Sequence, residues 1–235
     1  MPSYIPGMYY FDPTYIFIII GAVICMIASA NVNRTFKKYS KRSNSRGMTG
    51  EQVALQILRE AGIQDVSIEC VSGDLTDHYD PRNKVLRLSD SVYGSTSVAA
   101  IGVAAHECGH AIQHQVGYVP IQIRNMIVPA VNIGSKLSWP IILMGFIFGI
   151  TNLINIGIIL FSFALLFQII TLPVEFNASR RALQILEGRG FLSGDEMRGA
   201  KSVLRAAAMT YVTAMISTLL QLVRLVLLFG RRSDD

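Results

Sequence analysis

The chain has 235 residues, of which 51% are hydrophobic and only 16% are charged, and its formal net charge is +5 at neutral pH. Soluble domains carry about 25% charged residues, so this composition is typical of a membrane protein. The basic residues lie mainly beside apolar runs. This placement indicates a role in membrane orientation, and we expect no nucleic-acid partner. The three cysteines stand in unrelated contexts and predict no disulfide framework.

The first predicted element is an apolar run over residues 15–30 that is followed by a basic segment without acidic residues. Its basic residues are Arg34, Lys37, Lys38, Lys41, Arg42 and Arg46. A signal peptide is the alternative, because residues 28–30 (Ala-Ser-Ala) resemble a cleavage site. Signal peptides carry their positive charge before the apolar core, and here no Lys or Arg precedes it. We therefore predict an uncleaved membrane anchor over residues 1–31, with the basic segment in the cytoplasm.

Residues 32–120 are predicted to form a cytoplasmic α+β part. Thr49 and Gln52 form a capping box for a helix that Gly62 ends. Residues 66–71 and 84–88 are short strand candidates separated by turn-rich segments. These strands could offer a sheet edge to an extended peptide, or they could form a small hairpin that only supports the next helix. His78 is interpreted as a solvated turn residue, with contact to substrate or metal as the alternative.

Residues 103–111 contain the pattern His-Glu-x-x-His, which is the signature of zinc-dependent hydrolases. His106 and His110 are four residues apart and share one face of a helix, so both can reach one ion about 2.0–2.1 Å away. Glu107 is rotated from that pair by roughly 100°, which places it beside a metal-bound water. Two hydrogen-bonded core histidines are the alternative. The pattern instead favours a catalytic zinc site.

The helix that carries this pattern has its own start and stop signals. Ser95 or Thr96 can cap its N-terminus, and the Ala-rich and Val-rich segment extends to about residue 115. Gly117 is suited to the position after the helix end.

Residues 121–174 are predicted to form a transmembrane hairpin. Its two apolar stretches, residues 132–150 and 152–172, each approach the roughly 20 residues that cross a bilayer as a helix. The short joint between them returns the chain to its starting side. A soluble, buried helical pair is the weaker alternative, because so much apolar length exceeds the needs of a small catalytic domain.

Glu175 follows the second crossing and opens a cytoplasmic helical part over residues 175–205. It is predicted to be the third zinc ligand, because two His and one Glu form an established catalytic set. His114 is the competing ligand, but on a straight helix it lies about 12 Å along the axis from His106. An interfacial carboxylate paired with Arg180 or Arg181 is the remaining alternative.

The last part, residues 206–235, contains an apolar stretch that ends near residue 229. We predict a fourth membrane helix there, although Arg224, Arg231 and Arg232 would be exported by a crossing and an interfacial helix is the alternative. The expected fold is thus a mainly α integral membrane protein with about four membrane helices: an N-terminal anchor, a helical hairpin and a C-terminal helix. A small α+β cytoplasmic, zincin-like part carries the site.

Four segments together carry a family resemblance that covers nearly the whole chain. They are residues 77–81 (DHYDP), 86–89 (LRLS), 104–113 (AAHECGHAIQ) and 172–183 (LPVEFNASRRAL). The chain resembles the YugP-type neutral zinc metallopeptidases of bacterial membranes. More distantly it is similar to the HtpX and CAAX-prenyl-protease group, in which a His-Glu-x-x-His helix and a Glu-x-x-x-Asp helix flank a membrane hairpin.

This resemblance implies that Glu175 is the third ligand and that the site faces the cytoplasm from the bacterial inner membrane. The chain departs from the distant group at Ser179, where that group has Asp. Asn177, Ser179 or another residue must then orient a ligating imidazole.

The predicted function is that of a membrane-bound zinc metalloendopeptidase. One Zn²⁺ held by His106, His110 and Glu175 activates a water, and Glu107 is the general base. The expected partners are the lipid bilayer and polypeptide substrates, with membrane proteins among the candidates. Candidates for stabilising the oxyanion are His78, His114, Tyr211 and the arginines after Glu175. The alternative function is a non-catalytic zinc protein that acts as a scaffold or binding module.

Overall fold

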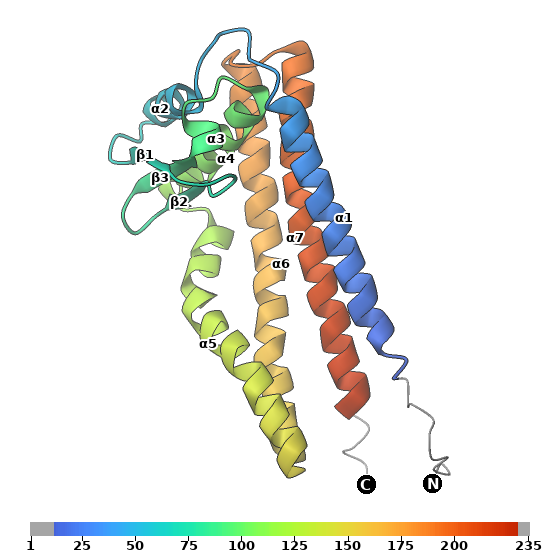
Figure 1. Ribbon diagram of the computed structural model, residues 1–235. Coiled ribbons are helices and arrows are strands. Elements are labelled where there is room, and N and C mark those ends of the chain that lie inside the picture. Colours follow the sequence, from blue (N-terminus) through green and yellow to red (C-terminus); the bar gives the residue numbers. More distant parts are fainter. Residues whose placement is uncertain (1–11, 230–235) are drawn as a thin grey trace.

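The computed structural model describes residues 12–229 (Figure 1). These residues form a mainly helical protein with one small sheet, as predicted. Its helices are α1 (Tyr15–Tyr39), α2 (Gly50–Glu60), α3 (Asp90–Tyr93), α4 (Val98–Gln115), α5 (Val119–Phe148), α6 (Thr151–Gly188) and α7 (Gly194–Phe229). Its strands are β1 (Ser67–Val71), β2 (His78–Asp80) and β3 (Val85–Ser89).

Four of these helices, α1, α5, α6 and α7, are long and apolar enough to cross a membrane. Within the most apolar windows of α5 and α6, only 28% and 17% of the residues are buried inside the protein. A soluble helical pair would be covered by other elements, so this exposure contradicts the soluble alternative. Figure 1 shows α5 beside α6 and α1 beside α7, with the sheet and α2 to α4 gathered at one end of these helices.

The long helices extend beyond the apolar runs that predict them. α5 begins at residue 119, before the apolar run at 132, and it includes Pro129 and Pro140. α6 passes Pro173 and continues to residue 188, and α7 runs without a break across position 206. Hydropathy locates the part of a helix that lipid can surround, but the same helix continues with polar residues where it meets the α+β part, which is formed by the sheet and α2 to α4.

Arg224 is a charged residue within the predicted fourth membrane helix, and it has a partner just before the N-terminus of α1. Its Nη2 atom donates to Asp12 Oδ2 over 3.2 Å, and its guanidinium lies 4.5 Å from the ring centroid of Tyr15. A paired arginine near a helix end is compatible with a membrane helix. Arg231 and Arg232, the other basic residues that argue for an interfacial helix, lie outside the described residues.

The sheet has the strand order β1-β3-β2. The strands predicted over 66–71 and 84–88 are present within one residue, but they run parallel, so the interpretation of these two as a hairpin is wrong. The hairpin is formed by β2 and β3, whose connecting turn is held by Asp80 accepting from the backbone N–H groups of Arg82 and Asn83. His78 therefore belongs to an edge strand, not to a turn.

Helix α4 lies at the centre of the α+β part. Its N-cap is Ser97 rather than Ser95 or Thr96, because only the Ser97 side chain accepts a hydrogen bond from the N–H group of Ala100. The Thr49 capping box of α2 is present as predicted. The alanines of α4 are fully buried among α2, β3, α6 and α7, so their small side chains let several elements pack closely around this helix.

Candidate metal centre

Three side chains from two helices converge beside the centre of α4. His106 and His110 project from α4, and Glu175 projects from α6. Glu175 Oε2 lies 3.3 Å from His106 Nε2 and 3.6 Å from His110 Nε2. Their ligand-capable atoms all lie within 4.8 Å of one another. The structure thus brings together the three residues that the sequence predicts as zinc ligands.

The carboxylate of Glu175 is suited to a cation. Its Oε2 atom is buried and has no hydrogen-bond partner, although it faces two imidazole nitrogens. A buried, unpaired carboxylate oxygen is unfavourable unless a charge or a donor satisfies it. Two histidine nitrogens and one glutamate oxygen form a donor set used by catalytic zinc sites. The residues at this place therefore fit a zinc ion.

Each imidazole is held through its other ring nitrogen. His106 Nδ1 lies 3.1 Å from Ser179 Oγ, and His110 Nδ1 lies 3.0 Å from Gln113 Oε1. The amide nitrogen of Gln113 donates to the carbonyl of Val174 and to Asn177 Oδ1, so its oxygen is left to accept from His110. His110 Nδ1 is then the donor, which leaves the Nε2 atom of a neutral ring to bind a metal beside Glu175.

The second oxygen of Glu175 is also fixed. Oε1 accepts a hydrogen bond from Arg124 Nη1 over 3.1 Å. The sequence offers Arg180 and Arg181 as alternative partners of Glu175, but Arg181 donates to Asn177 instead. Arg124 comes from the first helix of the membrane hairpin and precedes Glu175 by 51 residues. No local sequence pattern points to this contact.

Of the other predicted site residues, Glu107 borders the centre and His114 stands apart from it. Glu107 is 8% exposed and borders the same cavity as His106 and Glu175. Burial raises the pKa of Glu107 to about 7; His106 opposes this shift and Glu175 adds to it. His114 is not part of the metal-ligating cluster, and its Nδ1 lies 3.4 Å from Tyr79 Oη.

The chain matches, over residues 14–230, the model of a family described as "Putative neutral zinc metallopeptidase". It belongs to this family. A relative from Bacillus subtilis (strain 168), named "Putative membrane protease YugP", is 47% identical over 222 residues, which cover 94% of this chain and 99% of the relative. No solved structure matches the chain. These findings confirm the resemblance drawn from the motifs.

In this member of the neutral zinc metallopeptidase family, Gly109 explains how α4 and α6 come close enough for the three side chains to meet. A Cβ atom at this position would lie 2.7 Å from the carbonyl oxygen of Ala178. Any larger residue at position 109 would therefore push the helices apart. The glycine inside the motif has a packing role that the His-Glu-x-x-His pattern alone does not reveal.

A polar hollow of about 140 Å³ borders the candidate ligands of this family member on the side of β2 and α5. Among the sequence-based oxyanion candidates, His78 and Tyr211 line this hollow. Arg124, which the sequence does not predict, also lines it. His114, Arg180 and Arg181 are not among its lining residues. Polar side chains from β2, α5 and α7 thus line one space beside the candidate metal centre.

Proposed function

We propose that this protein is a membrane-bound zinc metalloendopeptidase that holds one zinc ion through His106, His110 and Glu175. The observation that carries the proposal is the buried, unpartnered Oε2 of Glu175, which faces both histidine Nε2 atoms. Family membership supports zinc as the metal and peptide bonds as the substrate. A zinc ion in such a site supplies Lewis acidity, which acidifies water and polarises a carbonyl group.

Glu107 is the proposed general base. Its carboxylate takes a proton from the attacking water and later delivers it to the amine that leaves. Glu107 borders both the polar hollow and a second, larger cavity, so it lies beside the space where a peptide bond would be placed. Tyr211, His78 and Arg124 are the candidates for donating to the carbonyl oxygen in the transition state.

An extended substrate has a strand beside which it can lie. β2 is an edge strand of the sheet and contacts α4. His78 and Tyr79 of this strand line the polar hollow together with the candidate ligands. We therefore favour the addition of a substrate peptide to the edge of β2 over a purely supporting role for the sheet. Such an edge strand beside the helix that carries His106 and His110 gives the α+β part a zincin-like arrangement.

The proposed location is the bacterial inner membrane, with the site facing the cytoplasm and membrane proteins among the substrates. Basic residues gather on three long helices toward the end that carries the catalytic part. They are Lys37 and Lys38 on α1, Arg180 and Arg181 on α6, and Lys201 and Arg205 on α7. The excess of Lys and Arg on cytoplasmic sides supports this orientation.

The test combines metal analysis with cleavage of casein and of a membrane protein by the purified full chain in detergent. We expect bound zinc, cleavage that a zinc chelator abolishes, and a Glu107→Gln variant that keeps zinc but loses about 10²-fold to 10⁴-fold in turnover. Glu187→Gln, at an exposed position on α6, is the matched control and should cleave normally.

Retained cleavage by pure Glu107→Gln protein would refute the role of the base. Bound zinc without cleavage of any substrate would instead favour a scaffold or binding module.

A further inference from the structure

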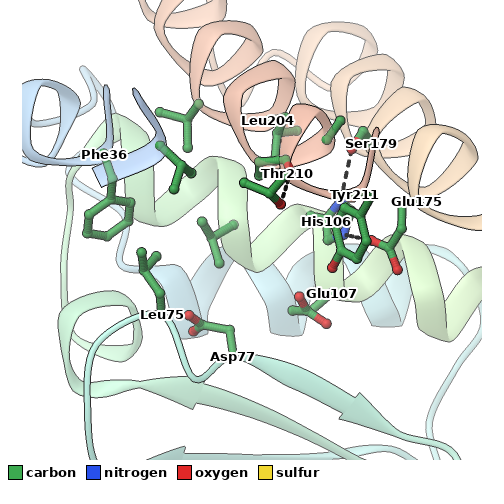
Figure 2. A pocket seen from close by; sticks show the side chains of 15 residues that line it. Phe36, Leu75, Asp77, His106, Glu107, Glu175, Ser179, Leu204, Thr210 and Tyr211 are labelled. Atoms are coloured by element: carbon green, nitrogen blue, oxygen red, sulfur yellow. Dashed lines mark hydrogen bonds and ion pairs between the residues drawn. The ribbon is translucent and has the colours of Figure 1, made fainter. Parts of the chain in front are cut away.

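A second cavity, of about 250 Å³, also borders the candidate metal centre. His106, Glu107 and Glu175 form one of its walls. The remaining apolar walls come from α1, α4, α7 and the segment between β1 and β2: Val32, Phe36, Leu75, Val103, Leu204 and Ala207. Figure 2 shows Phe36 and Leu75 on the left of the cavity, and His106, Glu175 and Tyr211 on the right.

Besides the candidate ligands, Glu107 and Tyr211, three polar side chains line this cavity, and all three are engaged with the protein itself. Asp77 accepts hydrogen bonds from the N–H group and the hydroxyl of Ser89. Thr210 donates to the backbone carbonyl of Ala207, and Ser179 contacts His106. Beyond the metal centre, Glu107 and the Tyr211 hydroxyl, the lining therefore offers mostly aliphatic and aromatic surface to an occupant.

The size of the cavity also favours an apolar occupant. A single water needs only about 10–15 Å³ of such space, so about 250 Å³ is far more than one water fills. Filling it with water would leave the apolar walls hydrated, whereas an apolar side chain would bury them. The two spaces beside the centre thus differ in the residues that they do not share: those of this cavity are mostly apolar, whereas the smaller hollow adds His78, Arg124 and Asn125.

We propose that the 250 Å³ cavity binds the side chain of a medium or large apolar substrate residue that flanks the scissile bond, and that it sets the cleavage preference. The inference rests on the proposed function, because it takes the substrate to be a peptide bound at His106, Glu107 and Glu175. It adds a substrate class: polypeptides with a leucine-sized to phenylalanine-sized apolar residue beside the cut.

The test measures binding rather than turnover. Peptide hydroxamates, which bind catalytic zinc, are prepared with one variable side chain next to the hydroxamate: Ala, Leu, Phe, Lys or Asp. Their dissociation constants are measured on the zinc-loaded full chain in detergent. Because each methylene in an apolar pocket changes binding or rate by about 10-fold to 200-fold, we expect the Leu and Phe compounds to bind at least about tenfold more tightly than the Ala compound.

Two variants change the cavity in opposite directions. Ala207→Phe fills it from α7 and should weaken the Phe compound about tenfold or more while leaving the Ala compound within about twofold. Val103→Ala enlarges it and should favour the Phe compound over the Leu compound. Ala214→Phe, two turns further along α7 and outside the lining, is the matched control for Ala207→Phe.

The outcomes separate this inference from the proposed function. A ranking by apolar size without cleavage of any peptide would support the cavity and contradict the peptidase. Cleavage with a flat ranking, or with the Lys or Asp compound preferred, would overturn the cavity and leave the peptidase standing. A failure of every hydroxamate to bind zinc-loaded protein would count against both.

Discussion

The Oγ atom of Ser179 on α6 lies 3.1 Å from the Nδ1 atom of His106 on α4. The more distant resemblance drawn from the sequence, to the HtpX and CAAX-prenyl-protease group, implies Asp at this position; here a neutral hydroxyl stands instead of a carboxylate. A hydroxyl oxygen can accept from Nδ1–H and fix the ring, as a carboxylate does, but it adds no negative charge. The contact can therefore hold the orientation of the imidazole without placing a negative charge beside it.

Ser179→Ala should therefore weaken zinc binding without unfolding the protein. Loss of an orienting partner of a metal ligand costs about 10-fold to 100-fold in affinity. Ser179→Asp should bind zinc at least as tightly as the natural chain, because a carboxylate makes the imidazole a stronger donor. Competition with a chromogenic chelator measures both affinities.

The matched control for Ser179 is Ser162→Ala. Ser162 is also on α6, and its hydroxyl donates only to the backbone carbonyl of Ile159. Zinc affinity should be unchanged in this variant. Equal affinities of the Ser179→Ala and natural chains would show that the hydroxyl does not orient the ligand.

The third ligand is tested by comparing Glu175 with His114. Glu175→Ala removes the carboxylate that faces both histidines, so zinc affinity should fall by more than the roughly 100-fold effect of an orienting residue. His114→Ala removes a contact with Tyr79 and should keep zinc, because His114 stands outside the cluster. Metal content after dialysis decides the matter: zinc lost from His114→Ala but kept by Glu175→Ala would reverse the assignment.

The sequence predicts the elements of this centre better than it predicts their contacts. Helical spacing places His106 and His110 on one face, since that relation is local to four residues. Hydropathy predicts the membrane hairpin. Because a hairpin brings the chain back to the side on which it started, Glu175 is expected on the same side of the membrane as His106 and His110. These inferences use only nearby residues or the dimensions of a bilayer.

What the sequence does not reveal depends on packing between distant segments. Arg124 reaches Glu175 only because α5 lies against α6, and Gln113 reaches Val174 only because α4 crosses α6. Gln113 is three residues after His110, a spacing that could have suggested their contact. The parallel pairing of β1 with β3 is hard to predict because β2 is only three residues long and gives a weak pattern.

Gly109 should tolerate no side chain at the crossing of α4 and α6. Gly109→Ala would place a Cβ 2.7 Å from the carbonyl oxygen of Ala178, and backbone at that point cannot yield easily. We expect a destabilisation of about 1–3 kcal/mol, as for other overpacked sites, together with weaker zinc binding. Thermal unfolding in detergent and the chelator titration measure the two effects.

Gly188→Ala is the matched control, because a Cβ added at this position, at the end of α6, would have no neighbouring atom within 4 Å. This variant should be neutral or more stable by up to about 1 kcal/mol, since alanine favours a helix over glycine. Equal stability of the Gly109→Ala and Gly188→Ala variants would mean that the close crossing is not required.

The orientation of the protein can be tested with its own cysteine on the catalytic part. Cys70 is exposed on β1, whereas Asn152 is exposed near the connection of α5 and α6 at the opposite end of the hairpin. If the catalytic part faces the cytoplasm, a membrane-impermeant maleimide should label Cys70 in inverted vesicles but not in intact cells. An Asn152→Cys, Cys70→Ser chain should show the reverse pattern.

Partial desolvation raises the pKa of the Cys70 thiol, and Asp90 adds to this shift. We therefore expect maleimide to label Cys70 more slowly than a fully solvated thiol. Labelling after denaturation in detergent therefore gives the full signal against which each fraction is compared. Labelling of Cys70 in intact cells would place the catalytic part outside. The basic residues on α1, α6 and α7 would then face the wrong side for the positive-inside rule, and the proposed cytoplasmic substrates would be excluded.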